Sequence, residues 1–270
     1  MPDPAPSIAP AQPTPADLPQ ALALLAQREQ ELAALRASHE DWLRALSHDL
    51  RAPLRHITSY TPLLRETLHV AGLQGGDAQE AEQFLGVMEQ AARRMGSMLD
   101  GVLQVAGMLR EHRRLQTVDL VQVADEVRAA LLAAEPTAAQ VQWRLPAAQV
   151  LLQADPQLLR AMLTALFDNA LKFSRGQSSP QISLQAEALP DGGVRWQVQD
   201  NGVGCDGSRA GQVFGLFQRL HRETEFDGVG VGLAVAQTAA RQHGAELSLH
   251  SAPGQGCTVV VNWPAPSPAQ

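Results

Sequence analysis

Apolar residues in the first quarter of the chain recur at the three- and four-residue spacing of an amphipathic helix. The stripe consists of Leu22, Leu25, Leu32, Leu43, Leu46, Leu50, Leu54 and Ile57, and Arg, Glu and Gln fill the opposite face. This pattern predicts one long helix from Leu22 to about Leu68. The glycines within residues 70–77 interrupt the pattern and predict a loop.

A second stripe begins after that loop. It consists of Phe84, Met88, Ala91, Met95, Met98, Val102, Val105 and Leu109, and Leu85, Ala92, Leu99 and Ala106 widen it. An apolar face this wide is more than a single helical hairpin can bury. Two such hairpins would cover each other best, so the pattern predicts a homodimer with a four-helix bundle.

After about residue 115 the pattern changes to short strands alternating with helices. Strands are predicted at 141–145, 150–154, 182–189, 194–199, 246–250 and 258–261, and helices at 118–134, 156–174 and 233–243. The predicted fold class is α+β, a helical-hairpin domain followed by an α/β sandwich. The expected division is a tail or linker at 1–20, the hairpin at 21–115, the sandwich at 116–264 and a tail at 265–270.

Composition narrows the classes of function. The net charge of −7 and the lack of a basic block disfavour nucleic-acid binding. Cys205 and Cys257 lie far apart in sequence without a CxxC spacing, which suggests neither a disulfide framework nor a zinc site and favours a reducing compartment. No segment has the apolar length of a membrane span, and residues 1–19 lack the features of a signal peptide. We therefore expect a soluble cytoplasmic protein.

The first candidate for chemistry is His48, in the segment ALSHDLRAP at 45–53. On a helix, His48 lies about 160 to 200° from Leu46 and Leu50, so it faces solvent when those leucines face a core. Asp49 can hold one ring nitrogen and leave the other as a nucleophile. Pro53 is expected to bend the helix one turn later. The segment alone is equally compatible with a solvated surface histidine beside an unrelated acid and a kink.

The second candidate is the helix that carries Asn169 and Lys172. These residues are three apart, so a carboxamide oxygen and an ammonium share one face, which suits Mg²⁺ and phosphate together. Lys172 is the one lysine among the 21 basic residues. A merely solvated helix face is the alternative.

Two glycine-containing segments supply the third and fourth candidates. Asp200, Gly202 and Gly204 follow a predicted strand, where an acid can accept a hydrogen bond from an adenine amino group and glycines allow close approach. Gly228, Gly230, Gly232 and Leu233 lead into a helix whose N-terminus can bind phosphate. The loop between them, with Phe214, Phe217, Arg219 and Arg222, is long enough to form a lid. Taken singly, each segment could be an ordinary turn.

The order of these segments along the chain resembles the H, N, G1, F and G2 boxes of two-component sensor histidine kinases. The resemblance covers about residues 22–264. The run VFGLFQRLHRETEFDGVGVGLAV at 213–235 is most similar to kinase modules attached to phytochrome-type photoreceptors. The resemblance to the kinase family implies a dimerisation and phosphoacceptor domain, followed by an ATP-binding domain of the Bergerat type shared with gyrase and Hsp90.

The resemblance also implies roles and partners. His48 would be the phosphoacceptor, Asp49 its orienting acid, Asn169 the Mg²⁺ ligand, Lys172 a phosphate contact and Asp200 the adenine contact. The remaining nucleotide-binding positions would be Gly202, Gly204, Phe217, Arg219, Gly228, Gly230, Gly232 and Leu233. The cofactors would be ATP and Mg²⁺. The partners would be a second copy, the receiver domain of a response regulator and an upstream sensor domain or protein.

Two positions depart from the family pattern. Ala52 stands where many members carry a Thr or Asn that helps dephosphorylate the partner, which predicts weak or absent phosphatase activity. Ala165 stands where a further Asn is usual, which predicts lowered ATP affinity or turnover. A degenerate kinase that acts as a dimeric nucleotide-binding scaffold is therefore an alternative. A Bergerat-type ATPase or protein-serine kinase would not account for His48, and a phosphotransfer domain alone would leave the second half unexplained.

Overall fold

The computed structural model describes residues 17–72, 74–110, 113–135, 140–220, 226 and 228–266. The predicted tail at 1–20 lies largely outside them, as do Arg222 and residues 267–270. The chain divides into two compact units, residues 1–46 and 47–270, with the boundary inside the first helix. No helix in the described ranges combines the length and apolarity needed to cross a membrane.

Two long helices, α1 (Asp17–Val70) and α2 (Gly76–Arg110), form the N-terminal part, as the apolar stripes predict. Helix α1 starts earlier than expected and continues through Pro53 and Pro62. Charged pairs join the second half of α1 to α2: Arg51 Nη2 lies 2.5 Å from Asp100 Oδ1, and Arg65 Nε lies 2.7 Å from Glu82 Oε1. These pairs fix the hairpin register.

The buried face of the hairpin near His48 differs from the one predicted. Leu46 and Leu50 are 39% and 41% exposed, whereas Ser47 is 2% exposed. Thr61 is buried too, and its hydroxyl donates to the Ile57 carbonyl at 2.6 Å. Next to His48, the small polar side chain of Ser47 is therefore the buried one, and the two leucines remain partly exposed within one chain.

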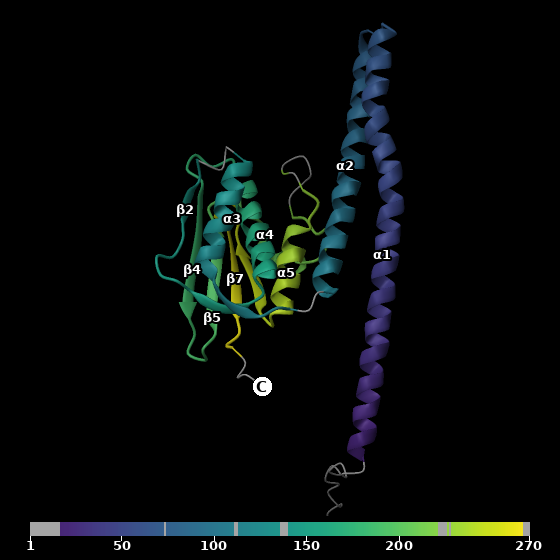
Figure 1. Cartoon of the computed structure of the whole chain (residues 1–270). Coiled ribbons are helices and arrows are strands. Elements are labelled where there is room, and N and C mark those ends of the chain that lie inside the picture. Colours follow the sequence, from purple (N-terminus) through teal and green to yellow (C-terminus); the bar gives the residue numbers. More distant parts are fainter. Residues whose placement is uncertain are drawn as a thin grey trace, which may run out of the picture. The chain divides into compact units, whose positions relative to one another are not determined.

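The C-terminal part is an α/β sandwich (Figure 1). Its five-stranded sheet has the order β2-β4-β5-β7-β6, and β2 pairs with β4 in parallel while the other pairs are antiparallel. The strands are β2 (Gln142–Arg144), β4 (Gln181–Ala188), β5 (Val194–Asp200), β6 (Glu246–Ser251) and β7 (Cys257–Trp263). One face of the sheet supplies buried residues such as Trp196, Val198 and Val261 to the core. Such burial of one face is usual for a mainly antiparallel sheet that is covered by helices on one side.

Helices α3 (Leu120–Ala134), α4 (Pro156–Ser174) and α5 (Gly232–Gln242) cover that face. A separate antiparallel pair, β1 (Gln116–Asp119) with β3 (Leu151–Ala154), leads into them. The sequence prediction wrongly began the first of these helices at Val118. Asp119 ends β1 and caps α3, since its Oδ1 accepts from the Val121 N–H at 3.0 Å.

A buried polar junction fixes the start of α4 relative to the end of α5. Asp155 caps α4 by accepting from the N–H groups of Gln157 and Leu158, and its other oxygen accepts from the Arg114 N–H at 2.9 Å. The Asp155 N–H donates to His243 Nε2 at 2.9 Å, and His243 Nδ1 lies 2.7 Å from the Ala239 carbonyl. The ring therefore donates through Nδ1, accepts through Nε2 and is neutral.

We predict that this junction weakens in acid. Burial lowers the pKa of His243, and this outweighs the hydrogen bond to Ala239 and the Asp155 carboxylate, which raise it. The unfolded chain therefore binds a proton at higher pH than the folded chain, and stability falls as the pH drops below about 6.5. His243→Gln keeps an acceptor for the Asp155 N–H but cannot titrate.

Urea unfolding of both proteins at pH 7.5 and pH 5.5 measures the effect. The stability cost of His243→Gln should shrink on acidification, whereas the titration of other groups cancels in the comparison. An equal cost at both pH values would contradict the assignment.

Candidate functional site

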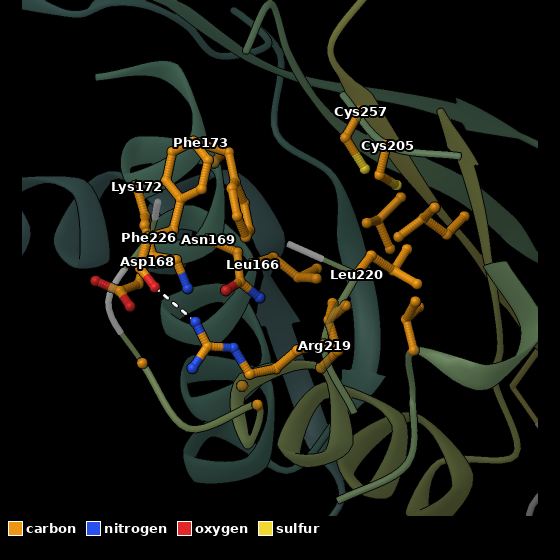
Figure 2. A pocket seen from close by; sticks show the side chains of 18 of the residues that line it. Leu166, Asp168, Asn169, Lys172, Phe173, Cys205, Arg219, Leu220, Phe226 and Cys257 are labelled. Carbon is orange, nitrogen blue, oxygen red and sulfur yellow. Dashed lines mark hydrogen bonds between the residues drawn. The ribbon is translucent and has the colours of Figure 1, made fainter. Parts of the chain in front are cut away.

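A cavity of about 260 Å³ lies where α4, β5, β7 and the segment before α5 meet (Figure 2). It gathers most of the residues that the sequence singled out. Its lining includes Asn169, Lys172, Asp200, Gly204, Arg219, Gly228, Gly230, Gly232 and Leu233. Gly202 and Phe217 are absent from this lining. The cavity thus collects groups from segments up to 93 residues apart, from Leu166 to Val259.

Helix α4 presents Asn169 and Lys172 to the cavity, as their spacing predicts. The Asn169 carboxamide makes no hydrogen bond within the described part of the chain, which leaves its oxygen available to a ligand. Its Nδ2 lies 3.2 Å from where a Cβ on Gly232 would be, so α4 and the start of α5 nearly touch here. Lys172 Nζ lies 4.5 Å from the Phe173 ring centroid, a cation–π arrangement that holds the ammonium group over the ring.

Asp200 ends β5 at the floor of the cavity and is only 7% exposed. Its Oδ1 accepts from the Gly202 N–H at 2.8 Å and the Cys257 N–H at 3.2 Å. Burial raises the pKa of Asp200 to about 6, although these two hydrogen bonds favour the carboxylate. Its second oxygen has no hydrogen-bond partner in the described ranges, so one acceptor oxygen remains for a ligand in an apolar surrounding.

Gly202 and Gly204 shape the segment after Asp200 through close backbone packing. A Cβ on Gly202 would lie 2.4 Å from the Phe173 carbonyl oxygen. Gly204 has φ +63°, and a Cβ there would lie 2.0 Å from the Ala252 carbonyl oxygen. Gly202 therefore supports the Asp200 turn from outside the cavity lining.

We predict that Gly204→Ala lowers the free energy of unfolding by about 3 kcal/mol or more, because backbone must move to relieve the clash. The matched control is Gly254→Ala. Gly254 has φ +75° but nothing within 4 Å of a Cβ, so only the conformational cost of about 1 kcal/mol is expected. Chemical denaturation of both variants measures the difference, and equal losses would contradict the packing argument.

The start of α5 exposes backbone N–H groups to the cavity. Its N-cap residue, Val231, makes no side-chain capping hydrogen bond, and Gly232 and Leu233 line the cavity. An uncapped helix N-terminus of this kind attracts anions. Gly228 and Gly230 adopt positive φ values of 117° and 73°, which direct the preceding segment around the cavity.

Four described residues between 217 and 227 line the cavity, namely Gln218, Arg219, Leu220 and Phe226. Arg219 Nη2 donates to the Phe226 carbonyl at 2.6 Å, and the Phe226 ring lies 5.0 Å from the Phe173 ring (Figure 2). Phe217 does not line the cavity but has φ 64°, and its N–H donates to the Gly230 carbonyl at 2.8 Å. This hydrogen bond links Phe217 to Gly230 across the sequence. The positive φ of Phe217 is a strained conformation for a non-glycine residue.

Cys205 and Cys257 also line the cavity, which sequence reasoning missed. Cys257 is the register partner of Asp200 across β5 and β7. This proximity depends on strand pairing over more than 50 residues, and no local sequence pattern reports it.

His48 lies on α1 and is exposed, as predicted. Its side chain is 82% exposed and that of Asp49 79%, and Nδ1 lies 3.2 Å from Asp49 Oδ1. When Nδ1 carries the proton and donates to Asp49, Nε2 retains a lone pair that faces solvent. The arrangement is that of an oriented, accessible nucleophile.

Comparison with known families gives a match for each part of the chain. Residues 38–110 match the family described as the His Kinase A (phospho-acceptor) domain. Residues 154–267 match the histidine kinase-, DNA gyrase B- and HSP90-like ATPase family. These two matches occupy most of the chain, which belongs to the two-component sensor histidine kinases and forms their kinase core.

Individual relatives are similar over nearly the whole chain. The chain is 30% identical over 242 residues to phytochrome-like protein Cph1 of Synechocystis, covering 89% of this chain and 31% of the relative. It is 29% identical over 255 residues to the methanogenesis regulatory histidine kinase FilI of Methanothrix harundinacea, covering 94% and 28%. The crystal structure of full-length ShkA with AMPPNP matches at a TM-score of 0.56 and 25% identity, covering 85% and 47%. The chain spans about a third of the length of these curated relatives.

Proposed function

We propose that this chain transfers the γ-phosphoryl group of MgATP to His48 and then to an aspartate on the receiver domain of a response regulator. The observation that carries the proposal is an exposed, carboxylate-oriented histidine in the same chain as a cavity with an uncapped helix N-terminus. An ATPase without a phosphoacceptor would not need the exposed histidine, and a phosphotransfer domain would not need the cavity.

The transfer step at His48 follows from its tautomer. Nε2 attacks the γ-phosphorus, an Nε2–P bond forms, and the bond from phosphorus to the β,γ-bridging oxygen breaks to release ADP. Asp49 accepts the hydrogen bond of Nδ1–H and stabilises the positive charge that develops on the ring. Because His48 is exposed and not enclosed in a pocket, the ATP-binding part of a chain must bring the γ-phosphoryl group to it.

Each cavity residue has a proposed part in holding the nucleotide. The free oxygen of Asp200 would accept from the adenine amino group, and Lys172 and the N–H groups at the start of α5 would bind phosphate oxygens. The unpaired Asn169 oxygen fits a Mg²⁺ ligand, since Mg²⁺ usually takes one or two protein ligands with phosphates and waters. No cluster of three or more His, Cys, Asp or Glu side chains competes for the metal in the described ranges. Bound Mg²⁺ would neutralise charge on the phosphates.

We also propose that the hairpin dimerises. Apolar side chains on α1 and α2 remain about half exposed in a single chain, among them Leu50, Leu63, Phe84, Met88 and Met95. A four-helix bundle with a second copy would cover them. The proposed hairpin domain is 21–115 and the ATP-binding domain 116–264, in a cytoplasmic protein controlled by an upstream sensor domain or protein.

The decisive test is incubation with Mg²⁺ and γ-labelled ATP, followed by acid and alkali treatment of the labelled protein. Acid-labile, alkali-stable label on the wild type and none on His48→Gln is the expected result. Label that persists in His48→Gln would show that another residue accepts the phosphoryl group and would contradict the proposal.

A degenerate kinase that serves as a dimeric nucleotide-binding scaffold is the second candidate. Ala165, one turn before Asn169, favours it because an apolar side chain packed against the core replaces a polar one. Nucleotide binding without label on either protein would support the scaffold. Ala165→Asn would then be expected to restore labelling if that position is the cause.

Weak phosphatase activity is a further prediction. Ala52, four residues after His48, is a half-buried methyl group that cannot orient water. Release of phosphate from a phosphorylated receiver domain should be slow, and Ala52→Thr should accelerate it. Rapid, His48-dependent release by the wild type would contradict the prediction.

A further inference from the structure

Both cysteines of the chain lie next to each other in the cavity lining (Figure 2). Cys257 is also the register partner of Asp200, and its N–H donates to Asp200 Oδ1. They are half-buried and free. Cys205 belongs to the loop after β5, and Cys257 is the first residue of β7. Two free thiols thus line one cavity, and the phosphoryl-transfer proposal uses neither of them.

Hydrogen bonds attach the two segments to each other. The Cys205 N–H donates to Ser251 Oγ at 2.8 Å, and Ser251 is the register partner of Cys257 across β6 and β7. The Ser251 hydroxyl in turn donates to the Gly256 carbonyl at 2.7 Å. Cys205 is therefore anchored next to the residue opposite Cys257, so the pairing of the thiols is a property of the fold and not of a mobile loop.

We propose that Cys205 and Cys257 form a redox modification site, in which a hydroperoxide converts the two thiols to a disulfide and lowers nucleotide affinity. In the first step the Cys205 sulfur attacks hydrogen peroxide, the O–O bond breaks, and a sulfenic acid and water result. In the second step the Cys257 sulfur attacks the Cys205 sulfur, the S–S bond forms, the S–O bond breaks, and a second water leaves. Two thiols lose two electrons in total and one peroxide gains them.

Charge around Cys257 assigns the order of the two steps. Burial, the Asp200 carboxylate and the neighbouring Cys205 raise the pKa of Cys257 to about 12, against a smaller lowering by the Ser251 side chain. Because the thiolate is the reactive form, Cys257 is the poorer first nucleophile and serves to resolve the sulfenic acid on Cys205. Removing the Asp200 charge should lower the pKa of Cys257 and so accelerate formation of the disulfide.

The expected loss of nucleotide affinity rests on the proposed function. The Cys257 N–H orients Asp200 Oδ1, so drawing Cys257 toward Cys205 displaces the proposed adenine acceptor. A disulfide also brings the sulfurs to about 2.05 Å and shifts both side chains within the adenine end of the cavity. A bound nucleotide should conversely slow oxidation by covering the thiols.

The test treats the full chain with hydrogen peroxide and follows it by intact mass, peptide mapping without reductant and AMPPNP binding. We expect the loss of two hydrogen atoms, one peptide joining Cys205 to Cys257, and at least a tenfold fall in affinity that dithiothreitol reverses. Cys205→Ser and Cys257→Ser are the matched controls, each compared with its own reduced form, and oxidation should change their affinity less than twofold. Asp200→Asn should form the crosslink several times faster than the wild type.

Separate sulfinic acids without a crosslink would overturn the proposal, as would a crosslink that leaves affinity unchanged. A reduced protein that binds no AMPPNP would instead overturn the proposed function, because mass and peptide mapping detect the crosslink without nucleotide.

Discussion

Asp200→Asn is expected to make the nucleotide-free protein more stable. The carboxyl is buried, and that burial raises its pKa to about 6 in the folded chain from an ordinary value of 3.8. The folded state therefore binds the proton more tightly than the unfolded state, so stability is lost as the pH rises from about 3.8 to about 6 and stays at the lower level above pH 6. A difference of about two pH units corresponds to about 3 kcal/mol at neutral pH.

The same substitution is expected to abolish nucleotide binding. Asn can keep both backbone hydrogen bonds, from Gly202 and Cys257, only by placing its oxygen where Oδ1 now lies. Its NH₂ group then replaces the free oxygen and points a donor at the adenine amino group. Two donors facing each other in a dry site should weaken ATP binding on the order of 100-fold or more.

Urea unfolding at pH 7.5 and pH 4.5, together with calorimetric titration of ATP at pH 7.5, tests both halves. The stability gain of Asp200→Asn over the wild type should be largest at pH 7.5 and clearly smaller at pH 4.5, because the carboxyl of the folded wild type is then protonated. A lower free energy of unfolding at pH 7.5, or ATP affinity within threefold of the wild type, would contradict the assignment of Asp200.

These two effects place Asp200 among residues that are retained at a cost in stability. An Asn with the same shape would satisfy the backbone equally well, so the fold alone gives no reason for a carboxylate there. The proposed adenine contact would give the second oxygen of Asp200 the hydrogen-bond donor that the described part of the chain does not supply.

Local sequence signals predicted the elements of the sandwich well where caps and alternation coincide. Asp155 and Pro156 set the start of α4 at the observed residue, and the strands of the five-stranded sheet fall within two residues of their predicted limits. The short strand β1 was merged with α3 because Val118 continues the helical apolar pattern. Only its pairing with β3, more than 30 residues away, makes it a strand.

The site was predictable to the extent that its residues lie in contiguous segments. Asn169, Asp200 and the 228–232 glycines each stand out locally, and the fold brings them to one cavity. The dithiol pair, the His243–Asp155 junction and the burial of Ser47 instead depend on contacts between distant segments. No short window of sequence contains the partner in any of these cases.

The side chains of Asn169 and Asn201 differ in their hydrogen bonding, so alanine should have opposite effects at the two positions. The Asn169 side chain has no hydrogen bond in the described ranges and faces the cavity. The Asn201 side chain accepts from the Gln181 N–H at 2.8 Å and donates to the Ser179 carbonyl at 2.9 Å. Asn169→Ala should therefore leave the free energy of unfolding within about 0.5 kcal/mol of the wild type, whereas Asn201→Ala should lower it by about 1 to 3 kcal/mol.

The rate of His48 labelling should show the opposite pattern, with the larger loss in Asn169→Ala and the smaller loss in Asn201→Ala. Without its proposed metal contact, Asn169→Ala should label His48 on the order of 100-fold more slowly, and a higher Mg²⁺ concentration should recover part of the rate. Asn201→Ala should retain the greater part of the wild-type rate at a temperature where it is folded, because its side chain is directed at backbone groups of 179 and 181. Labelling rates measured against Mg²⁺ concentration separate the two roles. A loss of stability in Asn169→Ala equal to its loss of rate would make Asn169 a structural residue and would leave the metal without its proposed protein ligand.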